Sequence, residues 1–367
     1  MKIAVIVGTR PEIIKMAPVA RALESNRVNY FILHTGQHYS YNLDRVFFEQ
    51  LRLQDARYNL EVGSGSHAEQ TAKILIGVEK VLEIEKPDIV LVEGDTNSVF
   101  AGAVAAVKLH ISVGHVEAGL RSYDRQMPEE INRILTDHCS DYLFAPTEKA
   151  EAILLGEGIH RDKIFVTGNT IVDAVYQNLE IAKRSFKFDV TPITSNAEHR
   201  TLNPEPRNYF LITLHRQENV DNEARLSSIL EGLDRVTTEF ALPVIYPIHP
   251  RSRKMMEHFN LDPKNLKLVE PLDFLSFLQL ECNARLILTD SGGVQEEACI
   301  LKVPCVTLRD NTERPETIDV GANMLAGASS DKILDCVKIM ISRENNWINP
   351  FGDGKAGERI VEIITGD

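Results

Sequence analysis

The chain has 367 residues, of which 43% are apolar and 25% charged, and its formal net charge is −13. This length exceeds what one hydrophobic core usually supports, so we expect two domains. The acidic excess disfavours nucleic acids and anionic membranes as partners. It also requires a local group of positive side chains wherever an anionic substrate binds.

The cysteines and the lengths of the apolar runs bear on the compartment in which the protein is expected. Five scattered cysteines form no CxxC pair and no metal-like spacing, which predicts reduced thiols and no bound metal. The first apolar run is too short for a signal peptide, and no run approaches the roughly 20 apolar residues of a membrane span. We therefore expect a cytoplasmic protein.

Short apolar, β-branched runs alternate with helical stretches along the chain. Strands are predicted at Lys2–Gly8, Tyr30–Gly36, Ile89–Asp95, Ser112–Ala118, Tyr142–Thr147, Ile164–Asn169, Tyr209–His215, Pro243–His249, Leu266–Pro271, Ala284–Ser291 and Val303–Asp310. Helices are predicted at Glu12–Ser25, Asn97–His110, Glu129–Ser140, Leu226–Glu239 and Gln295–Leu301. Because most strands are continuous apolar runs, the pattern predicts an α/β fold with parallel sheets buried on both faces.

A break in this alternation falls at about Lys183–Arg207, which contains three prolines and has weak periodicity. We interpret it as a domain connection or a surface insertion. The strands then divide into about six before the break and five or six after it. This count predicts two Rossmann-like domains, residues 1–170 and 171–354, facing each other across a cleft. Ligands of such sheets sit at the carboxyl ends of the strands.

The first predicted strand runs into a glycine turn and then a helix that carries Arg10 and Lys15. These two cations either bind a diphosphate together with the helix N-terminus or belong to a solvated first turn. The GxGxxG fingerprint is absent, which argues against NAD or FAD, and we expect no cofactor.

Three carboxylates lie at successive strand and helix ends: Asp95, Glu117 and Glu129. Clustered carboxylates repel one another, so some of them hold protons near neutral pH and can act as acids or bases. The alternative is structural, with Asp95 capping the next helix and Glu129 complementing a helix dipole. Because carboxylates recur at three successive strand and helix ends, we favour the functional interpretation.

The second half offers cations and backbone donors. His215 lies at the end of a predicted strand, where ligands of such sheets bind, although a single histidine is more often structural. A later strand runs into Ser291, Gly292 and Gly293 and then a helix, which exposes N–H groups that can hold a phosphate or simply form a tight turn. Glu297, one turn into that helix, can accept hydrogen bonds from a ribose diol, and Arg314 follows the next strand.

The chain closely resembles the non-hydrolysing UDP-N-acetylglucosamine 2-epimerases in the stretches GTRPEIIKMAP, EGDTNSVFAG, GHVEAGLRS, MPEEINR, LHRQEN, TDSGGVQEE and RDNTERPE, and later in PFGDGKAGERIVE. The resemblance implies the two-Rossmann, GT-B-type architecture of one large glycosyltransferase class, with the C-terminal helix, about residues 355–367, packing back on the first domain. It implies a homodimer acting on a UDP-linked amino sugar.

The resemblance also implies roles for the residues. Arg10, Lys15, His215 and Arg314 would surround the diphosphate and sugar, and Asp95, Glu117 and Glu129 match the family's catalytic carboxylates. Ser291, Gly292 and Gly293 would hold phosphate, Glu297 the ribose, and the Pro271–Phe277 region, including Phe277, the uracil. His215 is counted with the catalytic residues.

The family's route eliminates UDP to give a 2-acetamidoglucal and then adds it back, because the C2 proton lies beside no carbonyl. Bacterial members bind a second substrate molecule as an activator. Gln37, Glu129, Arg216 and His249 match residues of that site, whereas Ser40 and Ser64 stand where the family has Gln and Arg, so activation is left open. HRQEN and MPEEINR also occur in relatives acting on UDP-2,3-diacetamido uronic acids, so the sugar is left open too.

Three rival functions follow from the same residues. A retaining glycosyltransferase would not exchange the C2 proton, and the three carboxylates weigh against it. A hydrolysing epimerase would release UDP and free N-acetylmannosamine. A silent sugar-nucleotide-binding protein would have no use for Asp95, Glu117, Glu129 and His215.

Overall fold

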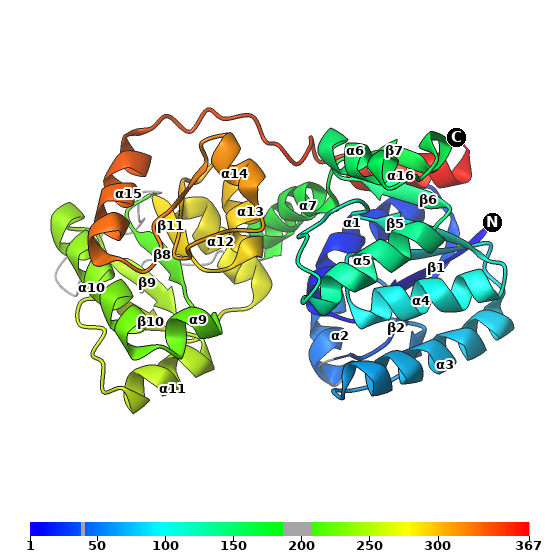
Figure 1. The fold of residues 1–367 in the computed structure, drawn as a ribbon, viewed down its shortest axis with the longest axis horizontal. Helices are drawn as coiled ribbons and strands as arrows, with labels where there is room; N and C mark the ends of the chain where they lie inside the picture. The colour runs from blue at the N-terminus through cyan, green and yellow to red at the C-terminus, as the bar shows by residue number, and fades with distance from the viewer. Residues whose placement is uncertain (38–40, 186–206, 367) are drawn as a thin grey trace. The chain divides into compact units, whose positions relative to one another are not determined.

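The computed structural model describes residues 1–37, 41–185 and 207–366 of the chain. The chain forms two compact units (Figure 1). Unit 1 comprises Met1–Gln177 and Phe351–Asp367, and unit 2 comprises Asn178–Pro350. The expected break at Lys183–Arg207 lies mostly outside the described residues.

Unit 1 is built on a parallel sheet of seven strands in the order β3-β2-β1-β4-β5-β6-β7. The strands are β1 (Lys2–Val7), β2 (Asn29–His34), β3 (Tyr58–Asn59), β4 (Ile89–Glu93), β5 (Ser112–Val116), β6 (Tyr142–Ala145) and β7 (Ile164–Val166). Every residue of β4 is buried, as expected for a central parallel strand covered on both faces.

Helices connect these strands. They are α1 (Arg10–Ser25), α2 (Tyr41–Gln50), α3 (His67–Glu85), α4 (Asn97–Lys108), α5 (Pro128–Cys139), α6 (Glu148–Gly156), the 3₁₀ helix η1 (Arg161–Lys163) and α7 (Thr170–Ser185). One face of the sheet packs Ala4, Ile6, Val90 and Val92 into a core shared with α3 and α4. Thr96 caps α4 by accepting from the backbone N–H groups of its first turn, which satisfies donors that helix geometry leaves free.

The C-terminal helix α16 (Ala356–Thr365) belongs to unit 1 and packs on α1 (Figure 1). A Cβ on Gly357 would lie 2.9 Å from the Pro18 carbonyl, so the two helices can approach this closely only at a glycine. Asp173 of α7 accepts from the N–H groups of Ala356 and Gly357 at 3.2 and 2.9 Å. These bonds tie the start of α7 to unit 1, so the units divide inside α7 and not at residue 170.

Unit 2 has a parallel sheet in the order β10-β9-β8-β11-β12-β13. Its strands are β8 (Phe210–Thr213), β9 (Val244–Pro247), β10 (Lys267–Val269), β11 (Leu286–Thr289), β12 (Cys305–Thr307) and β13 (Asn323–Leu325). Its helices are α9 (Gln217–Val220), α10 (Glu223–Phe240), α11 (Pro250–His258), α12 (Phe274–Asn283), α13 (Gly292–Ile300), α14 (Pro315–Asp319) and α15 (Ser330–Ser342). The order is that of a Rossmann sheet.

The α/β class and the two Rossmann-like units agree with the sequence analysis. The eleven observed strands that were predicted all end one to three residues before the predicted runs do, because the polar residues at the ends belong to loops, and five of them also begin inside the predicted run. The strands β3 and β13 were not predicted, since two and three residues are too short for a periodic signal. None of the described helices is both long and apolar enough to span a membrane.

Candidate active site

The segment after β1 brings a buried carboxylate to the carboxyl end of the unit 1 sheet. Glu12 accepts from the Gly8 N–H at 2.6 Å and the Thr9 hydroxyl at 2.9 Å. Burial raises the pKa of Glu12 to about 7, against hydrogen bonds that lower it. Gly8 is required here, because a Cβ would lie 2.0 Å from the Ser98 hydroxyl. Glu12 can therefore gain or lose a proton near neutral pH.

Lys15 lies between two further carboxylates. Its ammonium forms ion pairs with Glu117 and, at 3.2 Å, with Glu93. The side chains of Lys15 and Glu93 are 14% and 2% exposed. Burial raises the pKa of Glu93 well above its ordinary range, and the charges of Glu117 and Glu12 add to the rise. Lys15 is thus paired with two carboxylates at a site that is largely shielded from water.

Glu117 has a backbone conformation that suits a functional position. Its φ is +66°, which a non-glycine residue rarely adopts and which usually marks a functional or strained position. Its carboxylate also accepts from the Asn169 amide at 3.1 Å. The loop that follows β5 is thereby fixed with the carboxylate turned towards Lys15.

Asp95 follows β4 and is partly exposed. It pairs with Arg133 of α5 at 2.6 Å, and Arg133 also contacts Glu130 at 2.8 Å. Thr96, and not Asp95, caps α4, so the structural alternative for Asp95 is wrong. Glu129 lies half-buried in the first turn of α5, where it complements the helix dipole. The Glu129 side chain forms no hydrogen bond with the described residues.

A buried histidine holds the loop that carries Asp95. The Nδ1 atom of His115 lies 2.6 Å from an Asp137 oxygen, and its Nε2 atom lies 2.8 Å from the Gly94 carbonyl. The Asp137 carboxylate and the Gly94 carbonyl each offer an oxygen that can accept a hydrogen bond from the ring. Arg121 also pairs with Asp137, at 2.7 Å. His115 therefore fixes the backbone next to Asp95.

At the carboxyl end of the unit 2 sheet, Asp290 organises the loop after β8. The fully buried Asp290 accepts from the backbone N–H groups of His215 and Arg216 at 3.0 and 2.9 Å. The His215 Nδ1 atom lies 3.2 Å from the same carboxylate. Burial opposes ionisation, but hydrogen bonds from His215 and the backbone outweigh it and lower the pKa of Asp290. The His215 ring is thus oriented by a buried anion.

The turn from β11 into α13 leaves room for a ligand. Ser291 is the N-cap residue of α13 but its side chain accepts no capping bond, and the helix starts at Gly292. A Cβ on Gly293 would lie 4.0 Å from the nearest side-chain atom, Ser291 Oγ. Open space beside free helical N–H groups is the setting in which an anion binds at a helix N-terminus.

Other predicted residues of unit 2 lie near this helix. Glu297 is nearly buried on α13, where its charge helps burial raise the pKa of Glu281 on α12. Phe277 on α12 is half-buried against the core beside this helix. The Nε of Arg314 lies 2.8 Å from Glu296, which positions the guanidinium at the start of α14.

The residues matched to an activator site belong to different units. In unit 1 the Gln37 side chain is buried and accepts from the Ser98 hydroxyl at 2.7 Å. In unit 2 Arg216 and His249 are exposed, and the His249 ring centroid lies 5.8 Å from that of His215. Burial and the neighbouring His215 lower the pKa of His249. Arg10 of unit 1 has its guanidinium carbon 4.8 Å from the Phe47 ring centroid.

The structure therefore gathers the predicted residues into two groups, one in each unit. The first contains Lys15, Asp95 and Glu117 and the second His215, Arg216 and His249. The sequence analysis missed Glu12, Glu93, Asp137 and Asp290. All four lie in or beside the segments that were singled out, but only burial and hydrogen bonding distinguish them from ordinary acidic residues.

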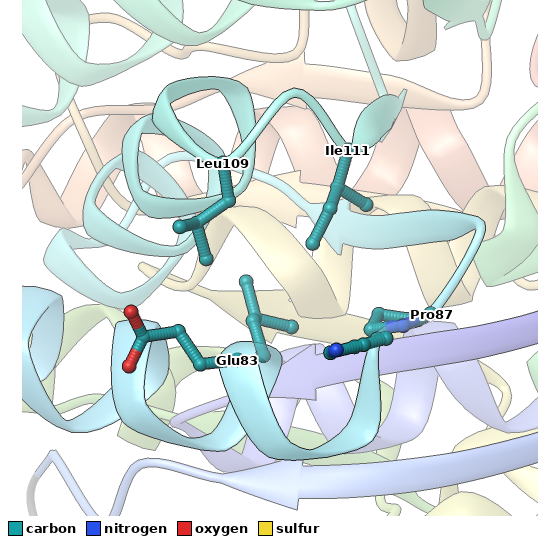
Figure 2. Close-up of a pocket in the computed structure, with 6 residues that line it drawn as sticks. Glu83, Pro87, Leu109 and Ile111 are labelled. Atoms are coloured by element: carbon teal, nitrogen blue, oxygen red, sulfur yellow. The ribbon is translucent and has the colours of Figure 1, made fainter.

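A pocket of 510 Å³ in unit 1 carries none of these residues (Figure 2). It is lined by Leu82, Glu83, Lys86, Pro87, Leu109 and Ile111. Pro87 and Ile111 come just before β4 and β5, so the pocket lies at the amino ends of these strands, away from the carboxylates. The described residues also contain no cluster of His, Cys, Asp or Glu side chains that could hold a metal ion.

The two Rossmann-like units define the fold class of this protein, a GT-B-like architecture. A glycosyltransferase from Streptomyces nogalater has the same fold, with a TM-score of 0.58 and 14% identity over 100% of this chain and 95% of that one.

The particular family follows from closer relatives. The model of the UDP-N-acetylglucosamine 2-epimerase family matches residues 21–365. The UDP-N-acetylglucosamine 2-epimerase of Methanocaldococcus jannaschii is 57% identical, with 100% of this chain and 99% of the relative covered. Its crystal structure with UDP-GlcNAc and UDP superposes with a TM-score of 0.86, at 56% identity and full coverage of both chains. A UDP-2,3-diacetamido-2,3-dideoxy-D-glucuronate 2-epimerase from Pseudomonas aeruginosa is 41% identical, with 99% of each chain covered. The chain belongs to the UDP-N-acetylglucosamine 2-epimerase family and is an epimerase.

Proposed function

We propose that this enzyme interconverts UDP-N-acetylglucosamine and UDP-N-acetylmannosamine by eliminating UDP to 2-acetamidoglucal and adding it back. The observation that carries the proposal is the set of buried carboxylates at the carboxyl end of the unit 1 sheet, where Lys15 pairs with Glu93 and Glu117 and burial raises the pKa of Glu12 to about 7. Acids and bases whose pKa lies near the working pH transfer protons most effectively. Removal of the C2 proton and its return on the other face require such groups.

The carboxylates of unit 1 are the proton-transfer groups in this proposal. Asp95, Glu117 and Glu129 are the catalytic candidates, and Glu12 and Glu93 tune the local charge. Lys15 stabilises Glu117 as an anion, and His115 fixes the backbone beside Asp95. As the C2–H bond breaks, the C1–O bond to UDP breaks as well, so the electron pair of the first bond forms the C1–C2 double bond.

The residues of unit 2 stabilise the leaving UDP. Negative charge grows on the departing phosphate oxygen, and preorganised donors that face growing charge lower the barrier. The N–H groups of Gly292 and Gly293 and the Ser291 side chain, together with His215 and Arg314, supply such donors. Glu297 takes the ribose and Phe277 the uracil. Because UDP remains bound, it is available for the return step.

The substrate assignment favours the N-acetylglucosamine sugar over the diacetamido uronic acid. The relative that acts on the first sugar shares 57% of its residues with this chain, and the relative that acts on the second shares 41%. Gln37, Arg216 and His249 are the residues to examine for a second, activating substrate molecule.

The test is incubation with UDP-N-acetylglucosamine in D2O, followed by proton NMR. We expect UDP-N-acetylmannosamine, with deuterium entering C2 of both epimers and little net UDP. Turnover of the UDP-linked diacetamido uronic acid alone would identify that sugar nucleotide as the substrate. Net UDP with free N-acetylmannosamine would identify a hydrolysing enzyme, and binding without exchange of the C2 proton would contradict epimerisation.

We also infer a cytoplasmic homodimer. The apolar pocket in Figure 2 and the 73% exposed Ile84 on α3 support a contact near α3 and α4, and five unpaired cysteines fit a reducing compartment. Light scattering should give twice the 41.2 kDa chain mass. An Ile84→Asp variant should shift it towards the monomer, and an Ile348→Asp control should not. A monomeric wild type would contradict the dimer, and cell fractionation tests the compartment.

A further inference from the structure

Three arginines line one pocket of unit 2 that lies apart from the candidate active site. The pocket has a volume of 290 Å³ and is lined by Arg207, Arg285, Pro304, Ile341, Arg343 and Asn345. Arg285 comes directly before β11 and Pro304 directly before β12. The pocket therefore lies at the amino ends of the parallel strands, whereas His215 and Ser291 follow the carboxyl ends of the same sheet.

Hydrogen bonds position these three arginines, which come from three parts of the chain. The Arg207 N–H donates to the Asn283 carbonyl at 2.8 Å, and the Arg285 N–H donates to the Tyr209 carbonyl at 2.9 Å. Arg343 follows α15, and its Nη1 atom donates to the Gly321 carbonyl at 3.3 Å. The positions of the three residues are thus fixed by the sheet and its flanking segments.

The charge at this pocket is unusual for this protein. The chain has a net charge of −13, and other exposed arginines of unit 2 pair with carboxylates, such as Arg235 with Asp331 and Arg253 with Glu270, both at 2.7 Å. Within the described ranges, no carboxylate forms an ion pair with Arg207, Arg285 or Arg343. Three like charges on one pocket repel one another, and an anion bound among them removes that repulsion.

We propose that this pocket binds a small phosphate-bearing anion. The planar guanidinium presents N–H donors in a fork that matches two oxygens of a phosphate, and Asn345 adds an amide. A volume of 290 Å³ corresponds to about ten water molecules of liquid, which is enough for a diphosphate group. The site is separate from the phosphate cradle at Ser291, because the two lie at opposite ends of the sheet.

The test is calorimetric titration of inorganic diphosphate into the protein at low ionic strength, with UDP saturating the active site. We expect one further binding event per chain. It should weaken at least tenfold in Arg285→Gln and in Arg343→Gln, and less in Arg343→Lys, which keeps the charge but loses the fork. The matched control is Arg235→Gln, which changes the net charge equally and should bind as the wild type does. Circular dichroism establishes that each variant is folded.

A parallel titration with adenosine diphosphate distinguishes two sources of the phosphate. Binding of both compounds, each lost in the arginine variants, identifies the pocket as a site for nucleotide phosphates, and binding of inorganic diphosphate alone identifies a site for the free anion. The proposal is overturned if neither compound binds, if the arginine variants bind as well as Arg235→Gln, or if chloride at equal ionic strength produces the same response. None of these outcomes depends on epimerase activity.

Discussion

The two parallel sheets share the order of their first six strands but carry different polar groups at their carboxyl ends. In unit 1, Glu93 and Glu117 pair with the ammonium of Lys15, the charge of Glu12 acts on Glu93, and burial raises the pKa of Glu12 and Glu93. In unit 2, backbone N–H groups and the His215 ring surround the buried Asp290, whose pKa is lowered.

This difference shows how one fold supports two kinds of chemistry. A sheet edge with too many carboxylates for its cations holds protons near neutral pH. A sheet edge with donors and a free helix N-terminus binds and stabilises anions. An elimination that moves a proton and releases a diphosphate needs both kinds of sheet edge. Mutations at one edge should impair proton transfer, and mutations at the other should impair UDP binding.

The largest effect is expected for Asp95→Asn in unit 1. Loss of this carboxylate should lower turnover by about 10² to 10⁴-fold, the usual contribution of a general acid or base. Binding of UDP should persist, because the donors of unit 2 remain. Rates of C2 deuterium exchange and a UDP titration measure the two properties. Asp55→Asn, an exposed carboxylate of the same unit, is the control, and normal turnover in Asp95→Asn would remove Asp95 from the catalytic set.

Lys15→Met should destabilise the folded protein by about 3–5 kcal/mol, because it leaves Glu93 and Glu117 buried without their cation. Urea denaturation followed by circular dichroism measures the change. Lys338→Met in unit 2 should cost at most about 1 kcal/mol, since its ion pair with Glu239 is exposed. Adding Glu117→Gln should restore part of the lost stability. Equal losses in the two lysine variants would contradict the special role of Lys15.

Glu12→Gln should change how stability depends on pH. The pKa of Glu12 is about 7 when folded and 4.5 ordinarily, so the folded state binds this proton more tightly. Glu12 therefore lowers stability as pH rises from 4.5 to 7, by up to about 3 kcal/mol. The glutamine variant should lack this decline, and its stability relative to the wild type should rise over the same window. Parallel pH profiles of the free energy of unfolding would refute the assignment.

Gly293→Ala should have the smallest effect, confined to ligand binding in unit 2. The added methyl group meets open space in the protein but would meet a phosphate at the start of α13. We expect UDP to bind about tenfold more weakly, or about 1.4 kcal/mol, with little change in stability. Gly156→Ala, also in a helix with nothing near its Cβ, is the control. An unchanged affinity for UDP would place the phosphate elsewhere.

Most of the fold could be predicted because continuous apolar runs between helical stretches have few alternative arrangements. The runs at Ile89–Asp95 and Ala284–Ser291 became the central strands β4 and β11. The short strands β3 and β13 could not be predicted, because their pairing depends on neighbours that lie beside them only after folding. The capping assignment for Asp95 was wrong for a similar local reason, since Thr96 competes for the same N–H groups and lies one residue nearer.

The sequence by itself determined the α/β class, the family and the segments that carry the candidate site, because these depend on periodicity and on motifs of adjacent residues. Only the tertiary structure decided which charges meet. Lys15 and Glu117 are 102 positions apart and His215 and Asp290 are 75 apart. The pKa of Glu12 depends on burial by the surrounding fold, and the arginine pocket on three segments that join at one sheet edge. Such properties depend on the distances between side chains in the folded protein and on how far each side chain is exposed to water. The order of residues along the chain does not state either quantity.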